Sequence, residues 1–150
     1  DRKTFESYKK AIDLDPEHFL AHFNLGIRYG KLRMNLEAAQ SFREALRLKP
    51  EAPMVHYSLA VVSNLIGEMD EAFKHYKEAI RINPDFGRAH SNIAMLYYGL
   101  KRGKETIHHL ARAAELFKQT GDEFMKKNAL DLIQECGREF DLTPEDCLTL

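Results

Sequence analysis

The chain has 150 residues, of which 44% are hydrophobic and 30% are charged, and its formal net charge is −1. This length suits one compact domain or a short repeat array, and the composition excludes an intrinsically disordered chain. Acidic and basic residues are mixed along the whole sequence, so no basic stretch is available to neutralise a line of phosphates. We therefore expect no nucleic acid partner.

Two further exclusions concern membranes and cysteine chemistry. The longest uncharged run, residues 52–67, contains proline, histidine, serine and asparagine, and it is too short and too polar to span a bilayer. We expect no membrane insertion. The chain opens at Asp1 without a signal peptide, which suggests a fragment or processed form. Cys136 and Cys147 form neither a disulfide framework nor a metal-site spacing, so we expect reduced thiols and a cytoplasmic protein.

Taken in chain order, the residues repeat with a period of 34, and no insertion breaks the register over three periods. Small, aromatic and proline positions all agree in phase. The repeated columns are Gly26, Ala60 and Ala94; Ala38, Ala72 and Thr106; Tyr8, Phe42, Tyr76 and Leu110; Ala11, Ala45, Ala79 and Ala113; and Pro16, Pro50 and Pro84.

Each period predicts a pair of helices. The first helix begins near the proline and carries apolar residues at helical spacing, such as Phe19, Phe23 and Ile27. A break follows, clearest at residues 67–68 and 103–104. The second helix, for example residues 36–48, has a small-aromatic-small stripe and ends at the next proline, which lacks the N–H that another turn needs.

This pattern resembles the tetratricopeptide repeat family, and residues 21–26 are close to that family's typical helix opening. The resemblance covers residues 1 to about 120. It implies an all-α fold, a right-handed α-solenoid of antiparallel helix hairpins, with a concave inner face.

The ends depart from the repeat. The last period has Thr106 for alanine, Leu110 for the aromatic and Lys118 for proline, so its second helix is expected to run on to about Thr120. Gly121 and Asp122 then predict a break and a new, capping helix. The expected segments are residues 1–16 as the second helix of a truncated first repeat, repeats at 17–50, 51–84 and 85–120, a capping helix at 121–140 and a tail at 141–150.

In the family the first helix of each pair lines the groove. The residues at the same repeat positions of this chain imply an apolar and aromatic groove with a few amides and cations. The implied groove residues are Phe23, Asn24, Ile27, Lys31, Met54, Tyr57, Ser58, Val61, Asn64, Arg88, Asn92, Met95 and Tyr98.

Asn24, Ser58 and Asn92 share one column of this groove. An amide both donates and accepts, so it can match the backbone of an extended ligand, as an asparagine does here in several family members. The alternative, that these side chains bond neighbouring helices or water, stays open.

The family's clamp for the carboxylate tails of heat-shock chaperones is not matched. Its two leading positions are Phe23 and Ile27 here, and only Arg88 retains the charge that a terminal carboxylate requires. We therefore expect no such clamp within this segment.

His22, His56 and His90 form another column. Equivalent residues of neighbouring hairpins lie about 8–10 Å apart or more, whereas zinc ligands lie about 2.0–2.1 Å from one ion, so we predict packing within each hairpin and no metal site. His108 and His109 point about 100° apart on a helix and are predicted at the surface.

The sequence contains no phosphate-binding glycine loop and no nucleophile motif, so we predict no catalytic residue, no enzyme activity and no cofactor. The first hypothesis is an adaptor that binds a peptide or helix of a partner protein in the groove. A second is a self-assembling structural module that associates through residues 1–16. A third is the substrate-targeting part of a larger enzyme, such as a protein glycosyltransferase, since those enzymes carry similar arrays.

Overall fold

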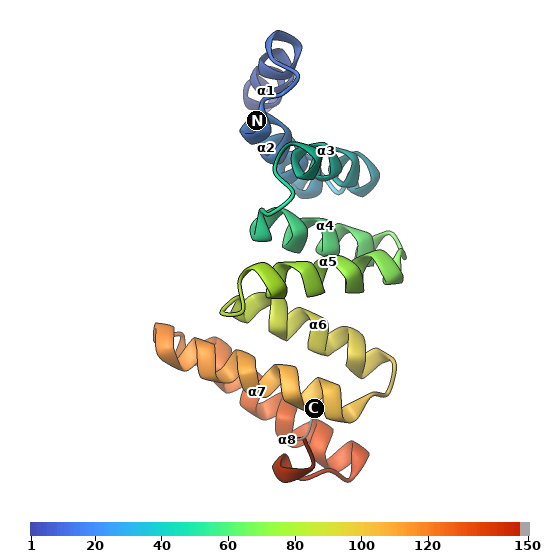
Figure 1. The fold of residues 1–150 in the computed structure, drawn as a ribbon, viewed down its shortest axis with the longest axis vertical. Coiled ribbons are helices and arrows are strands. Elements are labelled where there is room, and N and C mark those ends of the chain that lie inside the picture. Colours follow the sequence, from blue (N-terminus) through green and yellow to red (C-terminus); the bar gives the residue numbers. More distant parts are fainter. Residues whose placement is uncertain (148–150) are drawn as a thin grey trace. The chain divides into compact units, whose positions relative to one another are not determined.

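The computed structural model describes residues 1–147, and in that range the chain forms α-helices, one short 3₁₀ helix and connecting turns, without a β-strand (Figure 1). The predicted all-α fold is confirmed. The elements are α1 (Arg2–Leu14), α2 (Phe19–Lys31), α3 (Asn35–Leu48), α4 (Pro53–Leu65), α5 (Met69–Ile82), α6 (Gly87–Gly99), α7 (Gly103–Thr120), α8 (Glu123–Phe140) and η1 (Pro144–Cys147).

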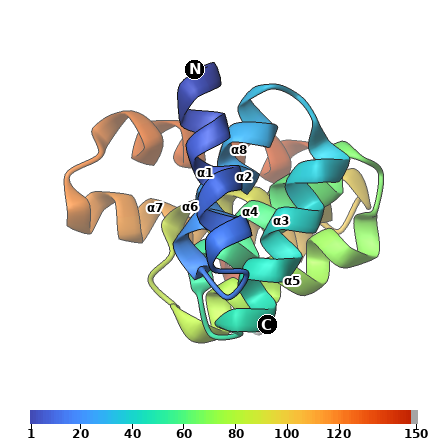
Figure 2. The ribbon, with the colours of Figure 1, turned by 90° about the horizontal axis from the view of Figure 1, so that it is seen from above.

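The helices belong to two compact units, Asp1–Ile82 and a second unit that begins at Asn83. In the first unit α2 packs on α3, α4 packs on α5, and α3 packs on α4, so that two helix hairpins are stacked. The first helices of these hairpins, α2 and α4, are also in contact. Figure 2 shows α3 and α5 on the same side of α2 and α4, which gives the first unit two layers of helices.

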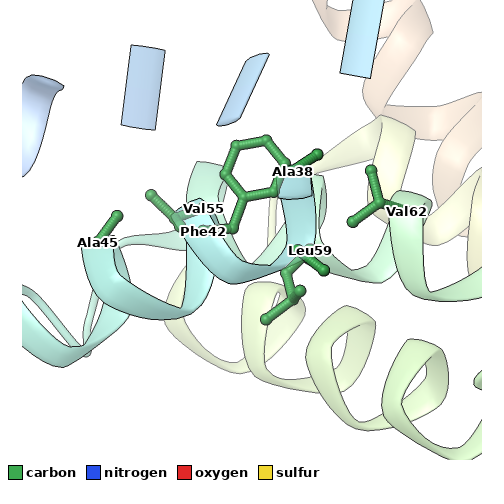
Figure 3. Packing of buried hydrophobic residues seen from close by; sticks show 7 residues of the cluster. Ala38, Phe42, Ala45, Val55, Leu59 and Val62 are labelled. Atoms are coloured by element: carbon green, nitrogen blue, oxygen red, sulfur yellow. The ribbon is translucent and has the colours of Figure 1, made fainter. Parts of the chain in front are cut away.

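The first unit has a core at the junction of its two hairpins (Figure 3). Small residues of α3 let the helix axes approach, while Phe42 and Leu59 fill the space between them. Full burial of one such large side chain stabilises the fold by about 1.5–3 kcal/mol. The cluster consists of Ala38, Ala39, Phe42, Ala45, Val55, Leu59 and Val62.

Each hairpin closes with the same turn. Its middle residue has a positive φ, and the residue after it donates its N–H to the carbonyl five residues earlier, which terminates the first helix as in a Schellman motif. The middle residues are Arg33 (φ 60°), Gly67 (φ 84°) and Lys101 (φ 58°). The bonds are Met34 N–Tyr29 O at 2.9 Å, Glu68 N–Ser63 O at 2.8 Å and Arg102 N–Tyr97 O at 3.0 Å. Of the three, only glycine takes this conformation without a steric cost.

The second unit contains one hairpin, α6–α7, and α8 packs on α7. The break predicted at residues 103–104 is wrong, because Gly103 is the first residue of α7 and the turn lies two residues earlier, around Lys101. A glycine is required at 103 for a different reason: a Cβ there would lie 2.7 Å from the Phe140 ring of α8.

The C-terminal helix starts as expected from its sequence. Gly121 ends α7 with φ 77°, and the Asp122 carboxylate accepts the backbone N–H of Met125 at 3.0 Å. Cys136 of α8 and Cys147 of η1 are buried free thiols in a cluster with Ile107 and Leu110 of α7. The burial of these apolar side chains holds the capping helix and the turn after it on α7.

Candidate functional site

The predicted groove residues of the first unit lie on α2 and α4, the two first helices that are in contact. On α2, Phe23 and Ile27 are half-buried and pack against the core cluster, and the Phe23 ring lies 6.0 Å from the Phe42 ring of α3. Asn24 is half-buried, and Lys31 is exposed. Phe23 and Ile27 therefore expose part of their surface to solvent, while the buried part packs within the hairpin.

On α4, Met54 is the most open apolar group of the face, with 50% of its surface exposed. Tyr57 and Val61 are half-buried, and the Tyr57 ring meets the Tyr76 ring of α5 edge-on at 6.0 Å. Asn64 is exposed at the end of the helix. The two helices therefore present a mostly apolar face, with Lys31 and Asn64 exposed near their C-terminal ends.

The three members of the Asn-Ser-Asn column differ in what they can offer a ligand. Within residues 1–147, the Asn24 side chain makes no hydrogen bond to the protein. Ser58 donates its hydroxyl to the Met54 carbonyl of its own helix at 2.8 Å, so that proton is already used. Asn92 is half-buried in the second unit. Of the two column members in the first unit, Asn24 is thus the one whose donor and acceptor are both available.

In the second unit the predicted residues lie on α6. Arg88 is exposed, and Met95 and Tyr98 are each 38% exposed. The Tyr98 hydroxyl donates to the Glu139 carboxylate of α8 at 2.6 Å, and its ring meets Phe140 edge-on. The bond to Glu139 raises the pKa of Tyr98. Tyr98 is therefore engaged by the capping helix, a contact that the repeat pattern did not predict.

The column of His22, His56 and His90 packs inside the hairpins, as predicted, and each ring is at least nine-tenths buried. Each Nε2 also contacts the carbonyl of the proline six residues earlier, at 2.8 Å to Pro16, 2.7 Å to Pro50 and 3.0 Å to Pro84. A carbonyl oxygen can only accept, so each Nε2 carries a hydrogen. The repeat column predicted the packing of these rings but not this bond.

The prediction that His108 and His109 both lie at the surface is wrong for His109. His108 is exposed, but His109 is half-buried, with its Nδ1 at 3.1 Å from the Nδ1 of His90 and its ring stacked on Tyr97. His75 makes the equivalent contact with His56. The missed signal was a second histidine 19 residues after the first in two successive periods.

Outside the α2–α4 face, a pocket of about 430 Å³ lies in the second unit between α7, α8 and the turn that follows. Its lining is mostly apolar and includes Ile107 and Ile133, together with the charged Arg138 and Asp141. Among residues 1–147 no three histidine, cysteine, aspartate or glutamate side chains are grouped to hold a metal ion. None of the helices so described is long and apolar enough to cross a membrane.

Comparisons with known proteins agree with this geometry. A sequence model of the tetratricopeptide repeat matches residues 26–86. No curated protein sequence matches the chain.

Several solved structures share the fold. A crystal structure of MamA is 16% identical, with a TM-score of 0.71 over 91% of this chain and 86% of that one. MamA residues 41 to the end from Desulfovibrio magneticus RS-1 are 16% identical, with a TM-score of 0.73 over 79% of this chain and 67% of that one. The TPR2B domain of yeast Sti1, solved as a complex with pHsp70, is 18% identical, with a TM-score of 0.70 over 76% and 91%. At these identities the likeness concerns the fold.

Proposed function

Because this chain is a tetratricopeptide repeat protein, and so has the fold of a protein-interaction module, we propose that it binds a segment of a partner protein on the first helices of its first unit. The binding face consists of Phe23, Asn24 and Ile27 of α2 with Met54, Tyr57 and Val61 of α4. Repeats of this family are in general non-catalytic, and the proposed role needs no reacting group.

The observation that carries this proposal is the partial exposure of apolar and aromatic side chains on the face. Met54 is half-exposed, and Phe23, Ile27, Tyr57 and Val61 are only partly covered although they belong to helices in contact. Exposed apolar and aromatic side chains that are rigidly held are the usual anchors of a protein interface. Asn24 adds a donor and an acceptor at the centre of α2, which suit the backbone of an extended ligand.

Removing the available side chains of the face should weaken binding without unfolding the chain. The variant Asn24→Ala/Met54→Ala removes one amide and one exposed thioether, both outside the buried core. Interface anchors of this kind contribute more than about 1 kcal/mol each, so we expect partner capture to weaken by about tenfold or more. Quantitative affinity capture with the full chain as bait, read by mass spectrometry, measures this.

The matched control is Leu36→Ala, which removes an exposed apolar side chain (65% exposed) from the second helix of the same hairpin. Partners that bind the proposed face should be retained by this control and lost by the double variant. Equal capture by wild type and Asn24→Ala/Met54→Ala would contradict the assignment of the face.

A second candidate function, self-association, is favoured by α1. This helix packs on α2 through contacts such as Phe5 with Tyr29, at 5.1 Å between ring centres, but none of its own residues is buried, and Leu14 is 78% exposed. If α1 is an assembly surface, light scattering over a hundredfold range of concentration should show the mass rising, and Leu14→Glu should suppress the rise. A constant monomer mass would exclude this function.

A further inference from the structure

Two histidines from opposite helices of one hairpin face each other inside the first unit. The Nδ1 atoms of His56 on α4 and His75 on α5 lie 2.9 Å apart, and both residues are more than nine-tenths buried. The ring centres are 5.2 Å apart, so the two nitrogens lie between the rings and point toward each other. This is a hydrogen bond between two imidazoles, and one hydrogen must lie between the two nitrogens.

The number of hydrogens at the pair limits its protonation. His56 Nε2 faces the Pro50 carbonyl at 2.7 Å, and His75 Nε2 faces the Glu71 carboxylate at 3.2 Å. With the contact between the rings, these are three contacts that each need one hydrogen, whereas two neutral imidazoles carry two. One added proton therefore completes the chain of bonds. A second would place two N–H groups head to head between the rings.

The same arrangement recurs in the second unit. His90 of α6 and His109 of α7 bring their Nδ1 atoms to 3.1 Å, and His90 Nε2 faces the Pro84 carbonyl at 3.0 Å. The first hairpin differs, because the partner position of His22 is Ser41, a buried residue that cannot titrate in this pH range. The chain thus contains two hairpins with the histidine pair and one without it.

Some of the charged groups around the first pair favour its protonation, and others disfavour it. On α5, the Glu71 carboxylate favours a charged His75, while Lys74 and the charge of His56 disfavour it. Glu78 of α5 also interacts with both rings. Burial is the largest influence and, with these charges, lowers the pKa of His75.

Two further elements lie next to the first pair. On α3, which packs against α4, Arg43 pairs with Glu68 and Arg47 with Glu17. In the loop before α4, Glu51 pairs with Arg81 of α5. These arginines and acids are exposed and bound to one another.

Around the second pair, Asp85 of the preceding loop favours a charged His90, while Arg112 and His108 of α7 disfavour it. Burial is again the largest influence and lowers the pKa of His90, against the bond to the Pro84 carbonyl. On α8, which packs on α7, Lys126 pairs with Glu123, and Glu139 accepts from Tyr98.

We propose that the two histidine pairs make the α4–α5 and α6–α7 hairpins unstable in acid. Each pair accommodates one proton between its facing nitrogens but not the charge of two imidazolium rings. Acidification to about pH 5, below the ordinary histidine range, then separates the helices of these two hairpins. The α2–α3 hairpin has serine in place of the second histidine, so it lacks this sensitivity to acid.

The sign of the effect follows from proton counting. In the unfolded chain both histidines of a pair bind a proton below a pKa of about 6.5, whereas the folded pair binds at least one fewer. The lowered pKa of His75 and of His90 acts in the same direction. The unfolded state therefore takes up more protons, and stability falls as the pH falls below about 6.5.

A consequence for binding follows from the position of the first pair. Tyr57, the residue after His56, meets Tyr76 across the same two helices, so opening this hairpin also disrupts the α4 part of the proposed binding face. This consequence rests on the proposed function. The test below measures stability alone and does not depend on it.

The test is urea unfolding of the full chain, followed by helical circular dichroism, from about pH 7 to about pH 5, above the range where carboxylates titrate. For each proton that the unfolded chain binds and the folded chain does not, the unfolding equilibrium constant rises about tenfold per pH unit below about pH 6. His75→Ser copies the residue that the chain itself has at Ser41. His75→Asn cannot titrate, and its amide can donate to a neutral His56 or accept from a charged one. We expect both variants to lower the pH slope by about one proton.

A pH slope that is the same in wild type, His75→Ser and His75→Asn would overturn the proposal, as would a chain that gains stability on acidification. If the variants do not fold, a side-chain ¹⁵N NMR titration of the wild type decides the question. The expected result is that His56 and His75 are never both doubly protonated while the chain is folded. Observing both as imidazolium in the folded chain would equally overturn it.

Discussion

Replacing Leu59 by alanine is expected to lower the free energy of unfolding of the first unit by about 2–5 kcal/mol. Leu59 has no exposed surface, and it belongs to the same core cluster as Phe42 and Val55. Its truncation removes the transfer free energy of the lost methyl groups and leaves a cavity that helices on both sides prevent from collapsing. Urea unfolding of the full chain measures the loss.

The control for this prediction lies on the same helix. Leu65 of α4 is 63% exposed, so Leu65→Ala makes the same chemical change without a cavity and should alter stability by no more than about 0.5 kcal/mol. Similar losses for the two variants would show that α4 does not form the junction between the hairpins.

Two glycines of α2, four residues apart, are expected to respond to alanine with opposite signs. A Cβ at Gly26 would lie 2.6 Å from the Phe42 ring, which is itself 97% buried and cannot move aside without disturbing the core. Gly26→Ala should therefore destabilise the first unit by about 1–3 kcal/mol. At Gly30 a Cβ would meet no atom within 4 Å. Alanine there should stabilise the helix by about 0.5–1 kcal/mol, because it has less backbone entropy to lose.

Thermal unfolding of the two glycine variants beside the wild type distinguishes close packing from helix propensity. If both alanines stabilise the chain, α2 and α3 are further apart than the described contact between Gly26 and Phe42, and the hairpin packing is wrong.

The repeat columns made the fold predictable because each column has one physical task. Small residues such as Ala38 and Ala45 allow helices to approach, the large residue between them fills the gap, and proline ends the second helix. The confirmed all-α fold follows from that agreement in phase. The turns were harder to predict, because Arg33 and Lys101 take the left-handed conformation that the sequence suggests only at Gly67.

Side chains outside the repeat could not be placed in the same way. Tyr98 belongs to a groove column, but the contact that holds it comes from Glu139 on α8, whose packing no repeated position specifies. The glycine at 103 likewise serves the packing of Phe140 and not a turn. The assignment of residues on α2 and α4 to a groove stays a prediction from their repeat positions. The structure adds that these residues are partly exposed.

The histidine pairs show a relation that was present in the sequence and overlooked. His75 and His109 follow His56 and His90 by 19 residues, and the hairpin geometry brings each two into contact. Comparing columns between the two helices of one hairpin, and not only along successive first helices, would have revealed the pairs.

The proposed binding face can be tested most directly with the five methionines of the chain, which are spread over its surfaces. Met54 lies on the face, whereas Met34 and Met69 lie at hairpin turns and Met125 lies on α8. In a ¹³C-methyl methionine NMR spectrum of the full chain, added partner segment should shift the Met54 signal and leave those of Met34, Met69 and Met125 in place. Shifts confined to the turn methionines or to Met125, with Met54 unchanged, would contradict binding on the first helices.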